Sequence, residues 1–491
     1  MTDLVGSSKL TLQTFVIGQS EKMLLTVLVS LCIVFSLLIS SLVFQDSVLS
    51  SDEWSYLIQA KIFSHGKLAV PSPRHRESFD FVHIVNNGRY YSKYPPGWPF
   101  LLAIGVWLDM PRVVNPLLGA GTLLLLYAIG KKLYTPGIAL LACLFAVASP
   151  YFLFNTASYF SHTASLFFVT LLLFLLMCGW EERRWSYFLL AGLSGSASFL
   201  VRPFDQCAVL VPIGIFLIVS RMRKQLATHH IASFALGQLS GVLLFLVYNA
   251  FQNGHPLVTG YHVADSWMDR WISLELWMWT YDVHYLVKLL TWSFPGIPLL
   301  ALVALVSTGP EATKRWERCL ASVLIAIMTA YAVVAFPEGP GYGPRYYYSG
   351  FLALPLLGSR GFVLLFGRST NKLLIPVLVG TALLEVGIVI PHHGRWAYDV
   401  ISEQNDFERQ VNRLNAGPAL VFLALDHEAN LDRTRNTIDF RGPIVYAHHR
   451  SAAADQVLME AYPGRRYFVY EYDQNRKQGV LREIRREREA D

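Results

Sequence analysis

Long apolar segments recur along most of this chain, and they constrain its fold more than any other feature. A helix needs about 20 apolar residues to cross roughly 30 Å of hydrocarbon. Hydrophobic residues make up 53% of the 491 residues and charged residues only 15%, which excludes an ordinary soluble enzyme. The apolar stretches are 22–44, 112–133, 137–155, 161–180, 186–201, 204–220, 231–252, 284–307, 319–336, 346–366 and 373–390. The sequence therefore predicts a polytopic α-helical membrane protein with about 11 transmembrane helices.

Basic residues in the short connections predict the orientation. The basic clusters lie at 131–132, 183–184, 221–224, 314–318 and 368–372. With a cytoplasmic amino terminus, all of them fall on the cytoplasmic side, as the positive-inside rule requires. This arrangement requires that the Pro-rich segment 95–108 does not span, so we interpret it as interfacial or re-entrant. The segments expected to be extracytoplasmic are then 45–111, 253–283, 337–345 and 391–491.

The first apolar segment, 22–44, is too long for a cleavable signal, and no small-residue cleavage site follows it. We expect a retained anchor, and a bacterial inner (plasma) membrane because no eukaryotic targeting signal is present. The five cysteines lie in or beside predicted spans, so no disulfide framework is indicated. The net charge of +6 comes mostly from the cytoplasmic clusters and the Arg-rich end, so nucleic acid is not an expected partner.

The composition changes after residue 390: charge rises and long apolar runs end. Buried strands are predicted at 419–424, 443–447 and 467–472, and helices at 452–461 and 482–489. This order predicts a small soluble extracytoplasmic α/β domain over 391–491, following a transmembrane module over 1–390. Because this segment has no Gly-rich phosphate loop, we expect a structural or acceptor-docking role for it.

The loop after the first span concentrates polar chemistry, beginning with Asp52 and Glu53. Two adjacent carboxylates just outside a span can act as general base, metal ligand or cation partner. A nearby low-dielectric surface raises carboxyl pKa values, which suits a base. The alternative is structural, since Ser50, Ser51, Asp52 and Glu53 together are typical of the start of a helix.

Two further parts of this loop suit phosphate. Arg74, with its neighbours His75 and Arg76 and the more distant His83, offers donors to phosphate or, alternatively, contacts lipid headgroups. In Lys93-Tyr94-Pro95-Pro96-Gly97, two prolines fix the backbone at the membrane face and hold Lys93 there.

Other polar residues lie at the expected outer ends of later spans. His162 is either a hydrogen-bonded structural residue or an acceptor-binding one. Arg202 either pairs with Asp205 or binds a ligand. Tyr261 and His262 lie in an aromatic-rich loop that suits either a membrane interface or the stacking of sugar rings.

A Gly- and Pro-rich segment, 339–344, precedes Arg345 and Tyr346. Its irregular backbone is predicted to fix Arg345 at the outer interface, where the phosphate of a lipid would lie. There the arginine either stabilises charge on a leaving phosphate or extends to headgroups. Glu385 lies inside the last predicted span and needs a partner or water.

Taken together, these motifs resemble the GT-C superfamily of membrane glycosyltransferases, over about residues 20–370. The resemblance is to the branch that contains protein O-mannosyltransferases and lipid A aminoarabinose transferases (glycosyltransferase family 39-like). The motifs that carry it are Asp52-Glu53-x-x-Tyr56, Lys93-Tyr94-Pro95-Pro96-Gly97, Arg345-Tyr346 with Pro355, and Leu200-Val201-Arg202-Pro203.

The resemblance implies transfer of a monosaccharide from a polyprenyl-phosphate donor to an acceptor hydroxyl, with inversion, on the extracytoplasmic face. Asp52 and Glu53 would be catalytic, with Asp52 as the base. Lys93, Arg345 and Arg74 would bind the donor phosphate. The acceptor or the sugar would contact Tyr56, Tyr94, His162, Arg202, Tyr261, His262 and Tyr346. The acceptor would be an envelope glycan, lipid or protein.

No cofactor is expected to be required, and a divalent metal could bind only at Asp52-Glu53. Where members of this branch often carry an aspartate at the outer end of the third span, this chain has Ser158 to His162. His162 is a candidate substitute there, or the acceptor differs. The alternative function is a transporter or flippase for lipids or polyprenyl-linked sugars, which would need polar groups near the midplane and commonly an internal repeat.

Overall fold

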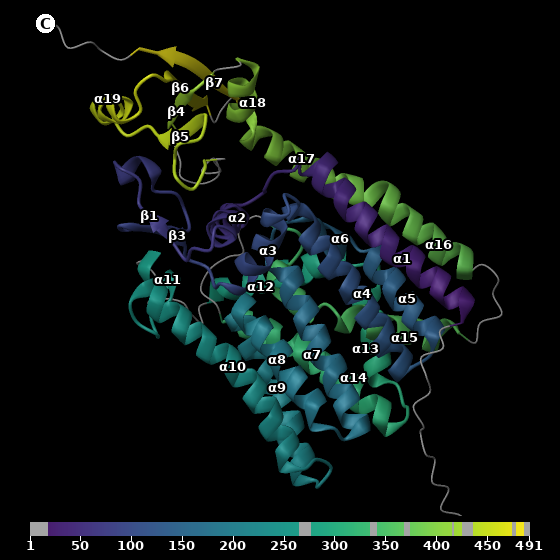
Figure 1. The fold of residues 1–491 in the computed structure, drawn as a ribbon. Coiled ribbons are helices and arrows are strands. Elements are labelled where there is room, and N and C mark those ends of the chain that lie inside the picture. Colours follow the sequence, from purple (N-terminus) through teal and green to yellow (C-terminus); the bar gives the residue numbers. More distant parts are fainter. Residues whose placement is uncertain are drawn as a thin grey trace, which may run out of the picture.

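In the computed structural model, a helical body carries a small sheet at one end (Figure 1). The structure describes residues 18–264, 276–333, 341–367, 374–414, 417–424, 436–473 and 478–485. The predicted Gly-Pro residues 339 and 340 and the tryptophans 267 and 271 lie outside these ranges.

Among the described residues, six helices are long and apolar enough to cross a membrane. They are Gln19–Val43 (α1, Gln19–Leu38, with a π-helical end), Pro111–Leu133 (containing α4, Val114–Leu133), α7 (His162–Glu182), α9 (Pro203–Met222), α10 (Thr228–Asn253) and Pro376–Gln404 (the end of α16, Leu374–Leu384, through α17, Ile390–Gln404). Two bent pairs raise this number to eight if each is one span. A multi-pass membrane protein is therefore confirmed, whereas the predicted count of eleven is not.

Two predicted spans are not straight helices. The first, 137–155, is α5 (Pro136–Val147) and α6 (Pro150–Ala157), bent by 64° where Pro150 opens the second helix. The second, 284–307, consists of α12 (Leu276–Trp292) and α13 (Ile297–Val306), bent by 100° between Val283–Trp292 and α13. Gly296 has φ +76° at this bend, a conformation that glycine adopts without strain.

Shorter or more polar helices occupy other predicted segments. α3 (Gly97–Trp107), α8 (Trp185–Val201) and α15 (Ala353–Phe366) are apolar but short. α14 (Glu311–Tyr331) begins with several charged residues. The predicted loop 253–283 is helical in its described part from residue 276 onward, where α12 begins.

The first loop forms α2 (Ser51–Ser64) and a small antiparallel sheet. The sheet has the order β1-β3-β2, built from β1 (Val70–Pro71), β2 (Ile84–Asn86) and β3 (Arg89–Ser92). The sheet leads directly into α3, which packs on α2. The polar loop is thus an ordered layer at one end of the helices (Figure 1).

The C-terminal segment forms a four-stranded sheet of order β5-β4-β6-β7. Its elements are β4 (Ala419–Ala424), β5 (Ile444–His448), α19 (Ala452–Ala461), β6 (Arg466–Asp473) and β7 (Gln478–Ile484). β4 pairs in parallel with β5 and β6, and β7 is antiparallel to β6. The helix expected over 482–489 is wrong for its described part, since Arg482 pairs with Val469 in the sheet. The predicted boundary at residue 391 falls inside α17.

This C-terminal segment packs directly on the first loop. The ring of Phe440 lies 4.8 Å from that of Phe79, and Arg450 Nε donates to the carbonyl of Glu77 at 2.8 Å. At the other end of the loop, Ser47 Oγ donates to Asn405 Oδ1 at 3.0 Å, just beyond α17. The loop that carries Asp52 is therefore held between the helices and the C-terminal sheet.

Candidate active site

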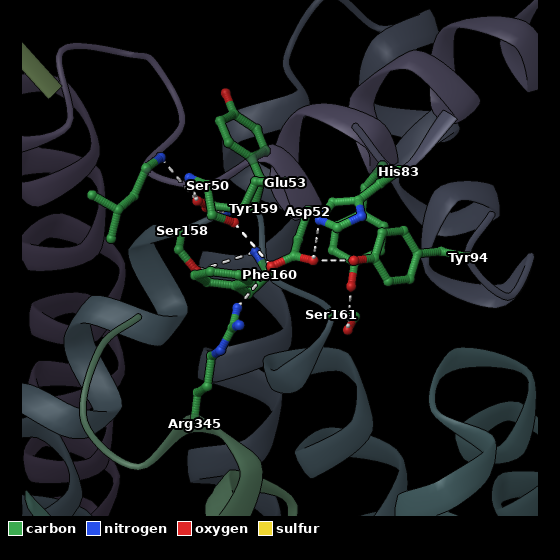
Figure 2. A network of polar contacts seen from close by, with 12 residues as sticks. Ser50, Asp52, Glu53, His83, Tyr94, Ser158, Tyr159, Phe160, Ser161 and Arg345 are labelled. Carbon is green, nitrogen blue, oxygen red and sulfur yellow. Dashed lines mark hydrogen bonds and ion pairs between the residues drawn. The ribbon is translucent and has the colours of Figure 1, made fainter. Parts of the chain in front are cut away.

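Asp52 lies at the centre of a polar cluster that joins three distant parts of the chain (Figure 2). Its Oδ2 accepts from Arg345 Nη1 at 3.0 Å and from Ser50 Oγ at 3.2 Å. Its Oδ1 accepts from the Tyr94 hydroxyl and lies 3.4 Å from His83 Nε2. Three hydrogen bonds and one ion pair thus engage a carboxylate that offers about four lone-pair positions.

Glu53 positions Asp52 by holding the start of α2 in place. Its side chain is buried, and Oε2 accepts from the amides of Leu49 at 2.9 Å and Ser50 at 3.1 Å. Oε1 accepts from the amide of Tyr159 at 2.8 Å. Of the two predicted roles for Glu53, these contacts favour the structural one, because both oxygens are engaged by backbone amides.

The turn that follows α6, residues 158–161, is fixed from several directions. Asn115 Nδ2 donates to the carbonyls of Ser158 and Phe160 at 2.6 and 2.9 Å, and Trp98 Nε1 donates to that of Tyr159 at 2.8 Å. Trp98 directly follows the predicted Lys-Tyr-Pro-Pro-Gly motif. The motif, the turn and the start of α2 therefore form one rigid unit around Asp52.

Arg345 is presented by a tightly anchored segment before α15. The hydroxyl of Tyr151 donates to the Pro344 carbonyl at 2.6 Å. Gly343 has φ +69°, and a Cβ there would lie 2.6 Å from the Tyr151 ring, so only glycine fits. The guanidinium lies over the ring of Phe160, 4.8 Å from its centroid. These contacts direct Arg345 at Asp52, a pairing that the sequence did not predict.

Lys93 lies beside the cluster, between two aromatic rings. Its Nζ is 5.5 Å from the centroid of Tyr94 and 5.2 Å from that of Tyr261, and the side chain is buried. The backbone of Lys93 touches Gly260, where a Cβ would come within 2.3 Å of the Lys93 carbonyl oxygen. The tyrosine rings contact each other at 5.5 Å, and Tyr56 packs on Tyr94 at 4.6 Å.

Burial and neighbouring charges shift the pKa of Asp52 in opposite directions. Burial favours the neutral acid, but Arg345, His83 and the Tyr94 hydroxyl outweigh it and hold the pKa of Asp52 below its ordinary range. Burial, together with the charge of Asp52, raises the pKa of Tyr94 well above its ordinary value. Tyr94 therefore stays a hydrogen-bond donor while Asp52 stays a carboxylate.

Arg202 belongs to a second, deeper network. Its Nε donates to Asp205 Oδ2 at 2.8 Å, and its Nη2 to the Tyr331 hydroxyl at 2.7 Å. Asp205 is fully buried and also accepts from Ser349 Oγ. The two networks meet at Ser161, whose Oγ lies 3.4 Å from both Arg202 Nη1 and the Tyr56 hydroxyl. The predicted pairing of Arg202 with Asp205 is confirmed.

Two further predicted residues border these networks. Among the described residues, neither ring nitrogen of the buried His162 has a hydrogen-bond partner, and its ring lies 5.3 Å from that of Phe160. Tyr346 stacks on Tyr331, with ring centroids 4.6 Å apart and the rings within 9° of parallel. Because buried polar side chains normally have hydrogen-bond partners, His162 is a candidate for binding a ligand here.

Three predicted polar residues lie apart from the cluster. Arg74 is exposed, and no contact joins it to Asp52 or Lys93 among the described residues. His262 is exposed and accepts locally from the amide of Thr259 at 3.3 Å. Glu385 is buried in the helix Pro376–Gln404, and its Oε2 has no partner there.

The structure adds residues that the sequence did not mark for this site. His83 was predicted, with the Arg74 cluster, to contact phosphate or lipid headgroups, and the structure places it against Asp52 instead. Its backbone has φ +67°, an uncommon conformation for a residue with a Cβ, which no local sequence pattern signals. No group of three His, Cys, Asp or Glu side chains within the described ranges could hold a metal ion.

Comparisons with known proteins agree with this architecture. A family model described as dolichyl-phosphate-mannose-protein mannosyltransferase matches residues 93–248. No curated protein sequence matches the chain. The fold is similar to that of ArnT from Cupriavidus metallidurans bound to undecaprenyl phosphate, with a TM-score of 0.59 at 13% identity over 91% of this chain and 92% of that one.

Two further solved structures share the fold. The apo state of the same ArnT has a TM-score of 0.57 at 12% identity, covering 92% of this chain and 93% of that one. An oligosaccharyltransferase from Archaeoglobus fulgidus, tethered to an acceptor peptide, has a TM-score of 0.52 at 11% identity, covering 92% and 69%. The resemblance to the GT-C superfamily that the sequence motifs indicate is therefore confirmed, by a family model in one part and by the fold as a whole.

Proposed function

We propose that this protein transfers a monosaccharide from a polyprenyl-phosphate donor to an acceptor hydroxyl at the membrane surface. The observation that carries the proposal is the ion pair between Asp52 and Arg345, 293 residues apart, with Lys93 beside it. A base paired with an arginine, with a lysine against the Tyr94 ring nearby, suits a reaction that deprotonates a hydroxyl and releases a phosphate. The undecaprenyl phosphate bound by ArnT, whose fold is similar, supports a donor of this lipid class.

In the proposed reaction, the acceptor oxygen attacks the anomeric carbon while its proton passes to Asp52. The bond between that carbon and the phosphate oxygen breaks with inversion, and polyprenyl phosphate leaves. Arg345 and Lys93 stabilise the charge that develops on the phosphate. Every bond and proton is accounted for by the two substrates and Asp52.

The occupied lone pairs of Asp52 suggest an order of events. Four groups surround its carboxylate, so an acceptor hydroxyl competes with them for its oxygens. Arg345 is the group with an alternative anion, since the donor brings a phosphate. We infer that the donor binds first, draws Arg345 to its phosphate and frees Oδ2 for the acceptor.

The remaining predicted contacts surround this centre. Tyr56, Tyr94, Tyr261 and Tyr346 supply rings for stacking on a sugar. His162 supplies two ring nitrogens without a hydrogen-bond partner in the described part of the chain. Arg202 is committed to Asp205 and Tyr331, so we assign it a positioning role.

The proposal includes a bacterial inner-membrane location with Asp52 on the extracytoplasmic side. We assign catalysis to residues 1–390 and an extracytoplasmic, acceptor-facing role to 391–491. The chemistry above assigns charge stabilisation to Arg345 and Lys93, so we expect activity without added metal. The contacts of Glu53 make it a positioning residue, and Arg74 stays a proposed phosphate contact at the rim of the site.

Donor turnover tests this proposal. The purified protein in nanodiscs is mixed with a panel of polyprenyl-phosphate monosaccharides and an envelope extract, and mass spectrometry measures free polyprenyl phosphate. We expect one donor to be consumed. If none is consumed, and lipid transport across the bilayer is found unchanged in Asp52→Asn, the protein is a transporter instead.

A further inference from the structure

A cavity of about 690 Å³ opens at the other end of the helices, between the turn after α7 and the turn after α9. Its lining includes Arg183, Arg221 and Lys224, with Thr228 and His230 from the first turn of α10. α10 has 26 residues and is therefore about 39 Å long. Its far end reaches β3, where Arg89 Nη1 donates to the Phe251 carbonyl at 2.9 Å. Figure 1 shows the α9–α10 turn opposite α2 and the C-terminal sheet.

The three cations at this cavity lack acidic partners. The nearest acids in sequence are committed elsewhere, because Glu181 pairs with Lys132, and Glu182 lies 3.7 Å from Arg184. No carboxylate pairs with Arg183, Arg221 or Lys224 in the part of the chain that the structure describes. Their neutral partners are backbone and hydroxyl groups: Arg183 donates to the Gln225 carbonyl, and Arg221 Nε donates to Thr228 Oγ1 at 2.9 Å.

The two turns that border the cavity are joined by hydrogen bonds of His230. His230 is buried, its Nε2 lies 3.0 Å from the Arg183 carbonyl oxygen, and its Nδ1 accepts from the Ala227 amide at 3.3 Å. These bonds join the two turns that form the walls. Thr228 and His230 place the first turn of α10 at the cavity, and the positive end of a long helix adds to the three cations. An anion is therefore the ligand that this cavity fits.

Exposed apolar side chains along α9 and α10, the helices that end and begin at the cavity, indicate where that anion comes from. On α9 the exposed residues are Val211, Ile215, Ile218 and Met222, and on α10 they are Leu236, Leu239 and Leu243. Met222, at 77% exposure, directly follows Arg221. These faces belong to two helices long enough to span the membrane, so acyl chains cover them. A phosphate in the cavity can therefore belong to a lipid whose acyl chains lie along these two helices.

We propose that this cavity binds the phosphate of an anionic phospholipid headgroup, whose acyl chains lie along α9 and α10. Basic pockets between transmembrane helices on the cytoplasmic side bind such lipids. The site is separate from Asp52 and independent of the transfer reaction. The bound lipid would hold helices α7, α8, α9 and α10 together at the predicted cytoplasmic surface, where α8 packs on the other three.

Native mass spectrometry of the full chain tests the proposal with phosphatidylglycerol and phosphatidylcholine as probes. The variant is Arg221→Gln/Lys224→Gln. The matched control is Arg184→Gln/Arg318→Gln, which removes the same charge from side chains that do not line the cavity. Each unpaired basic side chain near a membrane surface contributes roughly fivefold to anionic-lipid binding, so we expect retained phosphatidylglycerol to fall about 25-fold in the first variant. Arg184 and Arg318 already pair with Glu182 and Glu311, so we expect a much smaller loss in the control.

Hydrogen exchange at the first amides of α10 supplies the second readout. We expect slower exchange in phosphatidylglycerol nanodiscs than in phosphatidylcholine nanodiscs, and no such protection from inorganic phosphate at millimolar concentration. The proposal is overturned if both variants lose the lipid equally, which indicates nonspecific attraction, or if neither does. Protection by inorganic phosphate equal to that by phosphatidylglycerol would overturn the lipid assignment.

Discussion

Replacing Arg345 by glutamine tests whether this arginine sets the charge state of Asp52. The two side chains are 7% and 17% exposed, and their ion-pair distance is 3.0 Å. Burial raises the pKa of Asp52, and attraction to Arg345 is the largest effect that lowers it. Charges about 4 Å apart interact by about 4 kcal/mol at an effective dielectric of about 20, which corresponds to about three pKa units. Because water enters beside the smaller glutamine, we expect the pKa of Asp52 to rise by about one to two units.

The assay is the initial rate of polyprenyl phosphate release between about pH 3 and pH 9, because the pKa of Asp52 in the parent lies below its ordinary range. Asp52 must be a carboxylate to accept a proton, so a higher pKa removes activity at low pH and spares it at high pH. We expect Arg345→Gln to lose activity toward the acid end of this range, whereas the acid limb of the parent lies below it. Weaker stabilisation of the phosphate should also lower the rate at the optimum by about 10²–10³-fold.

A matched control separates this effect from a general loss of an ion pair. Arg112 pairs with Asp46 at 2.8 Å outside the cluster, so Arg112→Gln should keep the pH profile of the parent. If Arg345→Gln slows the reaction by one factor at every pH, with an unmoved acid limb, the reasoning about Asp52 is refuted.

Further predictions concern the surroundings of the cluster. Glu53→Gln leaves at least one buried amide without an acceptor, so the free energy of unfolding should fall by about 1–3 kcal/mol in thermal unfolding, and an unchanged midpoint would contradict its capping role. Phe440→Ala removes a buried ring that packs on Phe79, so amides of the first loop should exchange faster, and unaltered exchange would mean that the C-terminal sheet does not hold the loop. Donor turnover should persist in excess EDTA, and a loss that Mg²⁺ or Mn²⁺ restores would show a metal requirement.

The sequence indicated a membrane protein and marked the motifs around Asp52, but it did not indicate which of these residues contact one another. Apolar length identifies spans, because it reflects the cost of burying polar backbone in lipid. The motifs around Asp52, Lys93 and Arg345 were each visible, but the 3.0 Å contact between the first and last joins segments 293 residues apart. Such a contact depends on how helices pack, and local periodicity carries no signal of it.

Other features depended on geometry that a sequence does not display. The bends at Pro150 and Gly296 replaced two predicted straight spans, although Pro and Gly marked both places. His83 and Arg74 were grouped as basic loop residues, yet only His83 turns inward, through a left-handed backbone. The contact of Phe440 with Phe79 joins the predicted tail to the predicted loop, and neither segment alone indicates it.

Donor consumption by Asp52→Asn tests most directly whether Asp52 is the base of the proposed sugar transfer. Asparagine keeps the shape of the side chain but cannot take the proton of an acceptor hydroxyl. If Asp52 is the base, we expect the variant still to bind polyprenyl-phosphate sugar through Lys93 and Arg345. Its rate of polyprenyl phosphate release should fall about 10³-fold or more. A variant that binds the donor and keeps more than about a tenth of the parent's rate would show that Asp52 is not the base.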